Sequence, residues 1–528
     1  MLASSAFAQT VLYKTNDTND LGATTSWTLA TGGTGGSPSS LDGTQIATFD
    51  NTISSTNNAI SQTVITSVAF AGISVLDPAF PITIGSEGDS LTLGSSGITT
   101  SASEGITISA PLVLSASQTW DIAAASTISA AITGGAGIQI TKTGSGTLTW
   151  INAAMTGGSG ITVAQGILLT AGSTSTVPIV LDGGTYHGSS TTNSSPITCS
   201  TTGTILATAN PRAFSGTLAG SGTVTVSADN TAGAFDWGAS TSGFSGTLLV
   251  NGTNSTTGLV LFLATASNLS TVTVDLENIL SGGAISISIG ALTGTSSGAF
   301  ANFTTVPLTV GALNTSTTFA GFIKSAGSFT KTGTGSLTLT NNGNIYTGAT
   351  VINQGTLAVN GALTATSSTT INSGGTLAGT GTISSSGTVT LNSGGTVAPG
   401  ATLTLKNLTW AAGGTLLSAT TDGVGSNLLS LGSGTLTKNG TGTYDVDFGG
   451  VAFDSPYTYT LITYGAESGY SSSDFTAVDA TFGPNAIGAF TAGLTSLTYT
   501  ISIVPEPSTF ALLAGSLGLL AALRRRRA

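Results

Sequence analysis

Two pairs of acidic residues have the type and spacing that carbohydrate chemistry uses. Asp445 and Asp447 lie two positions apart, so on a β-strand both carboxylates would lie on one face. Glu87 and Asp89 stand in the turn-like segment Gly85-Ser-Glu-Gly-Asp-Ser90. Paired carboxylates can cleave glycosidic bonds, and the first pair could also bind Ca²⁺. We expect solvated strand and turn residues, since an active site would require these carboxylates to converge with Lys or Arg in a groove.

The other reactive residue types are scarce. His187 is the only histidine and Cys199 the only cysteine, which excludes a His pair for a metal, a Cys-based zinc cluster and an internal disulfide. A Ser-His-acid site would depend on His187 alone, and the flanking glycines Gly184 and Gly188 favour a surface or turn histidine. We expect Cys199 to be inert. The Gly-x-Gly segments lack the lysine of a phosphate-binding loop, so no cofactor and no metal is predicted.

Three lysines recur at one motif position. Lys142 and Lys331 are each followed by Thr-Gly, and Lys438 by Asn-Gly. A lysine that repeats with the motif suits a structural role in each copy better than the role of a single catalytic base. The sequence therefore predicts a protein that is not an enzyme, with a carbohydrate-active β-helix lyase or hydrolase as the alternative.

Composition and charge narrow the class of protein further. Only 6% of the 528 residues are charged and 74 are glycine, whereas a soluble enzyme has about a quarter charged residues. A hydrophobic content of 39% argues against disorder. The net charge is −11, and four of the 11 basic residues are the terminal Arg524 to Arg527. The rest of the chain lacks the basic stripe that phosphate contacts need, so no nucleic-acid partner is expected.

A period of about twenty residues runs along the chain. A small residue and Thr or Ser precede an apolar residue at six regularly spaced positions: Leu337, Leu357, Leu377, Val397, Leu416 and Leu436. A looser series in the N-terminal half comprises Leu148, Leu168, Tyr186, Ile205, Val224 and Leu248. This period is too short for helical-pair repeats. The units are instead typical of short alternating strands separated by Gly, Asn and Ser.

Stacked strand units predict an all-β fold, a parallel β-solenoid (β-helix) with irregular β caps and a short C-terminal hydrophobic helix. We expect an N-terminal β cap over 9–90, a solenoid of about 20-residue coils over 91–443, and a C-terminal β cap over 444–503. Coils in register place equivalent residues about 4.8 Å apart, where a repeated charge would repel its own copy by roughly 1 kcal/mol. Neutral side chains avoid this cost, and stacked Asn353, Asn372 and Asn392 are expected to form an amide ladder.

One segment of the repeat resembles a known family. The stretches Thr330-Lys-Thr-Gly-Thr-Gly-Ser-Leu337, Asn344-Ile-Tyr-Thr-Gly348 and Gln354-Gly-Thr-Leu357 are together similar to the autotransporter-associated β-strand repeat. A partial copy comprises 141–148 and 165–168, and 437–444 repeats only the opening. The resemblance implies an exported β-helical passenger.

Both ends of the chain suggest targeting. Ala6 and Ala8 have the spacing that a signal peptidase reads, which makes 1–8 the remnant of a secretory signal peptide. Within residues 504–528 a Pro-Glu-Pro triplet, an uncharged run and a terminal run of four arginines occur in this order, and together they resemble a PEP-CTERM sorting signal, found on exported proteins of Gram-negative bacteria that make exopolysaccharide. The resemblance rests on Pro505, Glu506 and Pro507, an uncharged run, and Arg524, Arg525, Arg526 and Arg527. It implies processing by an exosortase-type enzyme, and the uncharged run is expected to form a short transmembrane helix with its arginines in the cytoplasm.

These features predict an exported, non-catalytic β-solenoid that acts at the cell surface or in the extracellular matrix as a structural spacer or adhesin. The tail would anchor it in the inner membrane, transiently or stably, or release it. Extracellular polysaccharide is an expected partner of the many hydroxyl and amide groups. Besides the enzyme, a further alternative is a stalk that presents a C-terminal partner-binding module within 444–503, which an exposed patch of Tyr and Phe would favour.

Overall fold

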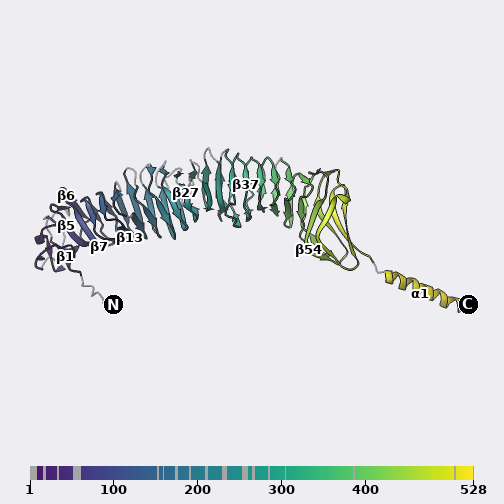
Figure 1. The fold of residues 1–528 in the computed structure, drawn as a ribbon, viewed down its shortest axis with the longest axis horizontal. Coiled ribbons are helices and arrows are strands. Elements are labelled where there is room, and N and C mark those ends of the chain that lie inside the picture. Colours follow the sequence, from purple (N-terminus) through teal and green to yellow (C-terminus); the bar gives the residue numbers. More distant parts are fainter. Residues whose placement is uncertain are drawn as a thin grey trace. The chain divides into compact units, whose positions relative to one another are not determined.

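The computed structural model describes residues 9–15, 20–31, 35–51, 61–151, 154–158, 160–172, 176–188, 192–207, 212–228, 235–238, 240–251, 260–263, 268–282, 286–303, 305–384, 387–504 and 507–526. The chain forms two compact units, Met1–Ile285 (unit 1) and Ser286–Ala528 (unit 2). In both units, short strands follow one another as rungs in the order of the sequence (Figure 1).

Unit 1 contains three sheets, which we call 1a, 1b and 1c. Sheet 1a has the order β2 (Trp27–Thr28), β1 (Val11–Lys14), β3 (Ile46–Phe49), β5 (Val68–Val75), β7 (Leu91–Thr100), β10 (Gln118–Asp121), β13 (Gln139–Thr143), β16 (Gly160–Val163), β18 (Ile179–Leu181), β21 (Ile197–Cys199), β24 (Thr217–Gly220) and β27 (Ser240–Phe244). From β7 it branches through β9 (Leu112–Leu114) and β12 (Ile132–Gly134) to β15 (Met155–Thr156). A short 3₁₀ helix, η1 (Thr24–Ser26), precedes β2.

The strands of sheets 1b and 1c alternate in sequence with those of sheet 1a. Sheet 1b comprises β4 (Ser61–Val64), β6 (Ile82–Ser86), β8 (Ile106–Ile108), β11 (Ser126–Ile128), β14 (Thr147–Ile151), β17 (Ile167–Ala171), β19 (Thr185–Gly188), β22 (Thr202–Ala207), β25 (Thr223–Ala228), β28 (Thr247–Val250) and β30 (Asn268–Leu276). Sheet 1c comprises β20 (Thr192–Asn193), β23 (Arg212–Phe214), β26 (Phe235–Trp237), β29 (Val260–Leu263) and β31 (Ile279–Gly282).

Unit 2 contains four principal sheets, 2a to 2d. Sheet 2a comprises β32 (Ile287–Thr293), β34 (Leu308–Val310), β37 (Phe329–Lys331), β39 (Thr350–Ile352), β42 (Thr369–Ile371), β45 (Val389–Leu391), β48 (Leu408–Ala411), β53 (Thr435–Asn439) and β56 (Ala466–Ser468). Sheet 2b pairs β33 (Phe300–Asn302) with β36 (Phe322–Lys324). Sheet 2c comprises β35 (Thr317–Phe319), β38 (Ser336–Leu339), β40 (Gly355–Val359), β43 (Gly375–Gly379), β46 (Thr396–Pro399), β49 (Thr415–Leu417), β54 (Tyr444–Phe453) and β57 (Phe475–Phe482).

Sheet 2d closes the set. It has the order β41 (Ala362–Leu363), β44 (Thr382–Ile383), β47 (Thr402–Leu405), β52 (Leu428–Ser430), β55 (Tyr457–Thr463), β59 (Ser496–Ile503) and β58 (Ala486–Ala492). A small hairpin joins β50 (Thr420–Thr421) to β51 (Gly425–Ser426), and the 3₁₀ helix η3 (Ser472–Asp474) precedes β57. A coil of the regular part, such as β39–β40–β41, therefore gives one strand each to sheets 2a, 2c and 2d.

Alternation of apolar and polar residues explains why these segments form strands with one buried face. In β14 the buried residues are Leu148 and Trp150, and the residues between them are partly exposed. Successive side chains of a strand point to opposite faces, so one face lines the core and the other meets solvent. Stacking buries what a single coil would expose. The prediction of an all-β parallel solenoid with a short C-terminal helix is confirmed.

The apolar column of sheet 2c differs from prediction at one position. Leu337, Leu357, Leu377, Val397 and Leu416 pair in register, each with the next. The residue that follows Leu416 in this column is Val446, not Leu436. Leu436 pairs with Leu408 in sheet 2a, so its predicted place was wrong. The cause is extra chain after β49, including the β50–β51 hairpin, which lengthens this coil.

The looser series of apolar residues in unit 1 also departs from the predicted pairing at one position. Leu148, Leu168, Tyr186 and Ile205 stack in register. Ile205 then pairs with Val226, whereas the expected Val224 faces Gly203. A shift of two residues keeps the apolar side chain on the buried face.

Parallel pairing extends beyond the boundaries predicted for the solenoid. Within 9–90, β1, β3 and β5 already pair in parallel, and the antiparallel strand β2 covers β1. Within 444–503, β54 and β57 continue sheet 2c in parallel, with a bulge after Asp447. Among the described strands of this region, antiparallel pairing joins only β55 to β59 and β59 to β58. The regions 9–90 and 444–503 therefore contain modified coils.

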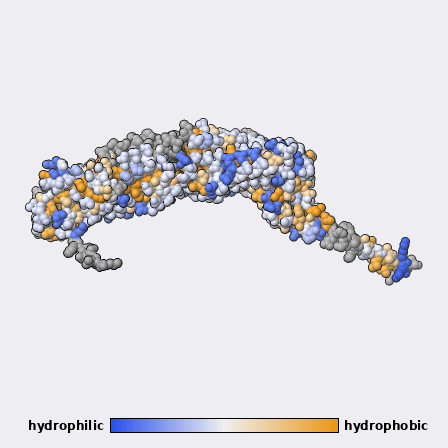
Figure 2. Space-filling view, viewed as in Figure 1, coloured by the Kyte–Doolittle hydropathy of each residue, from blue (hydrophilic) through white to orange (hydrophobic). Residues whose placement is uncertain are grey.

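The helix α1 (Pro507–Arg525) follows β59. Leu517, Leu519, Leu520 and Leu523 are each more than half exposed. Figure 2 shows apolar side chains on the coloured part of this helix and hydrophilic side chains near its end. Within the described residues, no helix has both the length and the apolar character needed to cross a membrane.

Candidate functional site

The carboxylates of Asp445 and Asp447 share the outward face of β54, as expected from their spacing. Asp445 lies between Thr415 and Thr476 of the neighbouring strands, and the Asp447 carboxylate accepts the backbone N–H of Gly449 at 2.8 Å. Among the described residues no Lys or Arg pairs with either carboxylate, and no group of three metal-ligating side chains exists. The geometry fits solvated strand residues.

The second acidic pair lies in the turn between β6 and β7. Glu87 is exposed, and the Asp89 carboxylate accepts the hydroxyl of Ser67 at 3.0 Å. Gly88, with φ +130°, makes the turn that a residue with a Cβ would resist. The two carboxylates thus lie on a turn. Among the described residues, no cationic side chain forms an ion pair with either of them.

The only histidine and the only cysteine lie in neighbouring sheets of unit 1. His187 stands on the outward face of β19, in register with Leu169 and Leu206, so it is a strand residue rather than a turn residue. Cys199 in β21 is fully buried, and burial raises the pKa of its thiol. A buried thiol with a raised pKa is a poor nucleophile, in line with the expected inert role.

The recurring lysines have a structural arrangement that we call the lysine clasp. Lys142 is fully buried, and its ammonium group donates to the carbonyl oxygens of Thr143 (3.2 Å), Gly144 (3.0 Å) and Gln165 (2.9 Å). The first two acceptors are the last residue of β13 and the glycine that follows it, and Gln165 belongs to the next coil. The ammonium has three donors and meets three acceptors, so its burial is compensated.

Lys331 of unit 2 repeats the clasp at the same sequence offsets. Its ammonium donates to the carbonyl oxygens of Thr332 (2.6 Å), Gly333 (2.9 Å) and Gln354 (3.3 Å). Gly355 follows the last acceptor with φ +63° and packs on the turn of the coil before it. A Cβ at Gly355 would lie 2.6 Å from the carbonyl oxygen of Gly335, so only glycine fits.

Burial controls the protonation of both clasp lysines. Desolvation lowers the pKa of Lys142 to about 8, although the charge of Asp121 acts in the opposite direction. Desolvation also lowers the pKa of Lys331 to about 8. These lysines hold turns together, which matches the predicted structural role.

Two further lysines show the limits of the motif. Lys14 is fully buried and donates to the carbonyl oxygen of Thr15 at 3.2 Å, which the sequence analysis missed. The available signal was the Lys-Thr step at the end of a short strand, shared with Lys142 and Lys331. Lys438, in contrast, forms an ion pair with Asp474 at 2.7 Å and remains partly exposed. Its motif position is equivalent, but its role is different.

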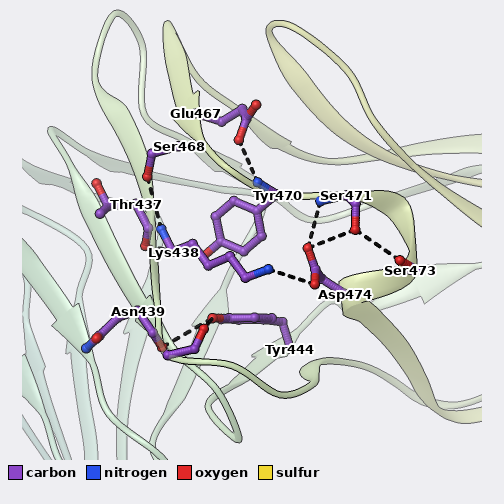
Figure 3. Close-up of polar contacts among 11 residues, drawn as sticks. Thr437, Lys438, Asn439, Tyr444, Glu467, Ser468, Tyr470, Ser471, Ser473 and Asp474 are labelled. Atoms are coloured by element: carbon purple, nitrogen blue, oxygen red, sulfur yellow. Dashed lines mark hydrogen bonds and ion pairs between the residues drawn. The ribbon is translucent and has the colours of Figure 1, made fainter.

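The Lys438–Asp474 pair lies among aromatic rings (Figure 3). The Lys438 ammonium is 5.8 Å from the ring centre of Tyr444 and 5.9 Å from that of Tyr470. The Asp474 carboxylate also accepts the backbone N–H and hydroxyl of Ser471, at 2.7 and 3.0 Å. The hydrogen bond from Lys438 is the main reason why the pKa of Asp474 is lowered. The pair ties η3 to β53.

The tyrosines near the C-terminal end lie mainly in the core. Tyr444, Tyr459, Tyr464, Tyr470 and Tyr499 are all buried. The rings of Tyr444 and Tyr470 meet edge to face, with centres 5.1 Å apart. Such a cluster stabilises the last coils rather than presenting an aromatic surface. It gives no support to the alternative of an aromatic partner-binding patch on these tyrosines.

The structure describes only some of the predicted targeting residues. Pro507 begins α1, Arg524 and Arg525 lie in its last turn, and Arg526 follows it. The remaining predicted residues of both ends lie outside the described residues: Ala6, Ala8, Pro505, Glu506 and Arg527.

One segment of unit 2 matches a known protein family. No curated protein sequence matches the chain significantly. Residues 329–359 match the model of the family described as Passenger-associated-transport-repeat, which supports the autotransporter-associated β-strand repeat predicted there. The matched segment runs from β37 to the end of β40 and contains the complete Lys331 clasp.

Proposed function

We propose that this protein is exported and acts at the cell surface or in the extracellular matrix as a structural spacer or adhesin. The observation that carries the proposal is the match of 329–359, because this repeat and the β-solenoid fold fit an exported structural or adhesin-like β-helix. Repeats and solenoids of this kind are typical of non-catalytic passenger domains.

The polar surface of the coils supports a mechanical or adhesive role. Outward positions of sheets 2a and 2c carry mainly threonine, for example Thr338, Thr356, Thr376 and Thr396. Figure 2 shows pale, near-neutral residues over much of the visible surface. Neutral hydroxyls do not repel their own copies in the next coil, so stacking these positions carries no electrostatic cost that would depend on ionic strength.

The sorting part of the proposal concerns the tail. We assign Pro505, Glu506 and Pro507, with Arg524, Arg525, Arg526 and Arg527, to a PEP-CTERM-like signal read by an exosortase-type enzyme. This assignment rests on the order of the three elements in the sequence. The apolar, exposed side chains of α1 and its basic last turn are compatible with it.

Fractionation of producing cells tests the proposal. The wild-type chain and a variant with Pro505, Glu506 and Pro507 changed to Ala are compared with a control in which Pro484 in the loop before β58 is changed to Ala. We expect the wild type and the control in the outer fractions or the medium, and the triple variant retained with the inner membrane. Identical distribution of all three chains would refute the sorting signal, and a cytoplasmic wild type would refute export.

A further inference from the structure

Two phenylalanines lie on the outward face of sheet 2b, where solenoid coils usually carry small polar residues. Phe300 and Phe322 pair in register, and their rings stack with centres 5.2 Å apart at 25°. The residues after them, Ala301 and Ile323, are buried, so the two rings point away from the core. Both phenylalanines are of intermediate exposure, so a part of each remains accessible to solvent.

The column of rings stops at a glycine. Ile345 donates its backbone N–H to the carbonyl oxygen of Ile323, which places Gly343 beside Phe322 in the next coil. A Cβ on Gly343 would lie 3.5 Å from Cγ of Phe322, so the glycine stands against this residue without adding a side chain of its own. Ala362 follows in the same column, since Thr364 donates to the carbonyl oxygen of Asn344.

A second outward column lies two residues further along each strand. It contains Asn302, Lys324, Ile345, Thr364, Ser384 and Lys406. Asn302 pairs with Lys324, and Ile345 is 44% exposed. Lys406 follows Leu405, which pairs with Ile383, the residue before Ser384. Lys324 and Lys406 are therefore four coils apart, about 19 Å at 4.8 Å per coil.

Among the described residues of 286–421, Lys324 and Lys406 are the two lysines whose side chains are neither buried nor paired. Residues 286–421 contain three lysines and no Asp or Glu. Lys331 is buried in its clasp, while Lys324 and Lys406 are exposed and have no hydrogen bond or ion pair among the described residues. In a chain of net charge −11, this stretch is locally positive. Its charge is complementary to an anionic ligand.

We infer that the face formed by these two columns binds an acidic polysaccharide, a chain of sugar rings with widely spaced carboxylates. The C–H face of one sugar ring packs on the side chain of Phe322 beside Gly343, because the negative face of an aromatic ring attracts the positive hydrogens of C–H groups. Carboxylates pair with Lys324 and Lys406, and the sugar hydroxyls exchange hydrogen bonds with Asn302, Thr364 and Ser384.

The sparse charge favours a polysaccharide over nucleic acid. Duplex DNA carries a charge about every 1.7 Å and is held by many basic side chains. Two lysines about 19 Å apart cannot neutralise such a polymer. A neutral polysaccharide would leave both lysines unused. The inference rests on the proposed function only for access to polysaccharide outside the cell, so binding in solution tests it separately from export.

Binding of the purified full chain to polygalacturonic acid tests the inference, with dextran as the neutral probe and duplex DNA as the competing polyanion. We expect retention on polygalacturonic acid, weaker retention at 0.5 M salt because the carboxylate contacts are screened, and none on dextran. Phe322→Ala should weaken binding about tenfold. The double variant Lys324→Gln/Lys406→Gln should remove the salt-dependent part.

Matched controls separate this face from general effects. Phe482→Ala removes an exposed phenylalanine of β57, and Asp479→Asn removes an exposed charge of the same strand, and neither belongs to the two columns. Both should bind as the wild type does. Equal binding of the wild type and the Phe322 and lysine variants, equal retention on dextran, or full displacement by DNA would each overturn the inference. Circular dichroism of every variant verifies that the coils remain folded.

Discussion

The ammonium group of Lys331 lies 3.3 Å from the carbonyl oxygen of Gln354, which belongs to the next coil. In unit 1 the same offset joins Lys142 to Gln165 at 2.9 Å. Each lysine also donates to two carbonyl oxygens of its own turn. A buried positive charge thus links two successive coils wherever the full motif occurs.

The clasp makes stability depend on pH in a defined direction. Burial lowers the pKa of Lys331 to about 8, whereas the lysine of an unfolded chain titrates near 10.4. Above pH 8 the unfolded chain therefore binds more protons than the folded one, and the free energy of unfolding rises with pH. We expect this rise between pH 8 and 10 in the wild type and a smaller rise in Lys331→Met.

Hydrogen exchange of β37 to β40 measures this effect, with Lys406→Met as the control that removes an exposed lysine. Above about pH 10 the trend should reverse, because burial raises the pKa of Tyr499 to about 12 and the unfolded tyrosines ionise first. Identical pH profiles for the wild type and Lys331→Met would show that Lys331 is not buried as described.

Gly355 is expected to tolerate no side chain. Its φ of +63° and its contact with the preceding turn make Gly355→Ala strained in both backbone and packing. We expect a loss of about 1–3 kcal/mol in the free energy of unfolding. Gly298→Ala is the control, since only the Ser296 hydroxyl lies within 4 Å of a Cβ there, at 3.9 Å. Urea unfolding followed by tryptophan fluorescence compares the two, and equal losses would contradict the clasp geometry.

The amide ladder should be most sensitive at its middle rung. Asn372 donates to the side-chain oxygen of Asn353 at 2.8 Å and accepts from Asn392 at 2.9 Å, as expected from the sequence. Asn372→Ala removes both hydrogen bonds, and Asn392→Ala removes one. At about 0.5–1.5 kcal/mol each, the first loss in unfolding free energy should be about twice the second. Urea unfolding would count against a continuous ladder if Asn392→Ala cost as much as Asn372→Ala.

Register can be tested with introduced charges. Thr356 and Thr376 pair in register on the outward face of sheet 2c. We expect the double variant Thr356→Asp/Thr376→Asp to be less stable than the sum of its single variants by roughly 1 kcal/mol at low salt. Thr356→Lys/Thr376→Asp should deviate in the opposite direction. A double-mutant cycle by urea unfolding measures both, and strict additivity would contradict this register.

Periodicity was sufficient to predict the stacking wherever the coils keep one length. Leu337 to Leu416 form one column because strands and turns repeat without insertions. Leu436 could not be placed, because the same small-polar-apolar motif starts strands of sheet 2a as well as sheet 2c. The spacing of twenty residues continues from Leu416 to Leu436, although Leu416 lies in sheet 2c and Leu436 lies in sheet 2a. Only the length of the inserted β50–β51 hairpin shows that the strand of Leu436 belongs to a different sheet from the strand of Leu416.

Contacts between distant parts of the sequence were beyond prediction. Lys438 meets Asp474 across 36 residues because η3 turns the carboxylate towards β53, and no periodic signal encodes that turn. Phe300 and Phe322 are likewise unremarkable in the sequence until their strands are aligned. The carboxylates and His187 lie on outward strand faces and in a turn, where solvated residues were expected from the sequence.

Labelling of cysteines on intact cells tests the central claim, an exported solenoid with closed coils, most directly. Cys199 is fully buried, so the wild type should not react with a membrane-impermeant maleimide. Thr364→Cys introduces a thiol at an exposed position of unit 2. We expect this variant to be labelled on unlysed cells, while Cys199 reacts only after denaturation. Labelling of Thr364→Cys only after lysis, or of native Cys199 at the same rate, would contradict the account.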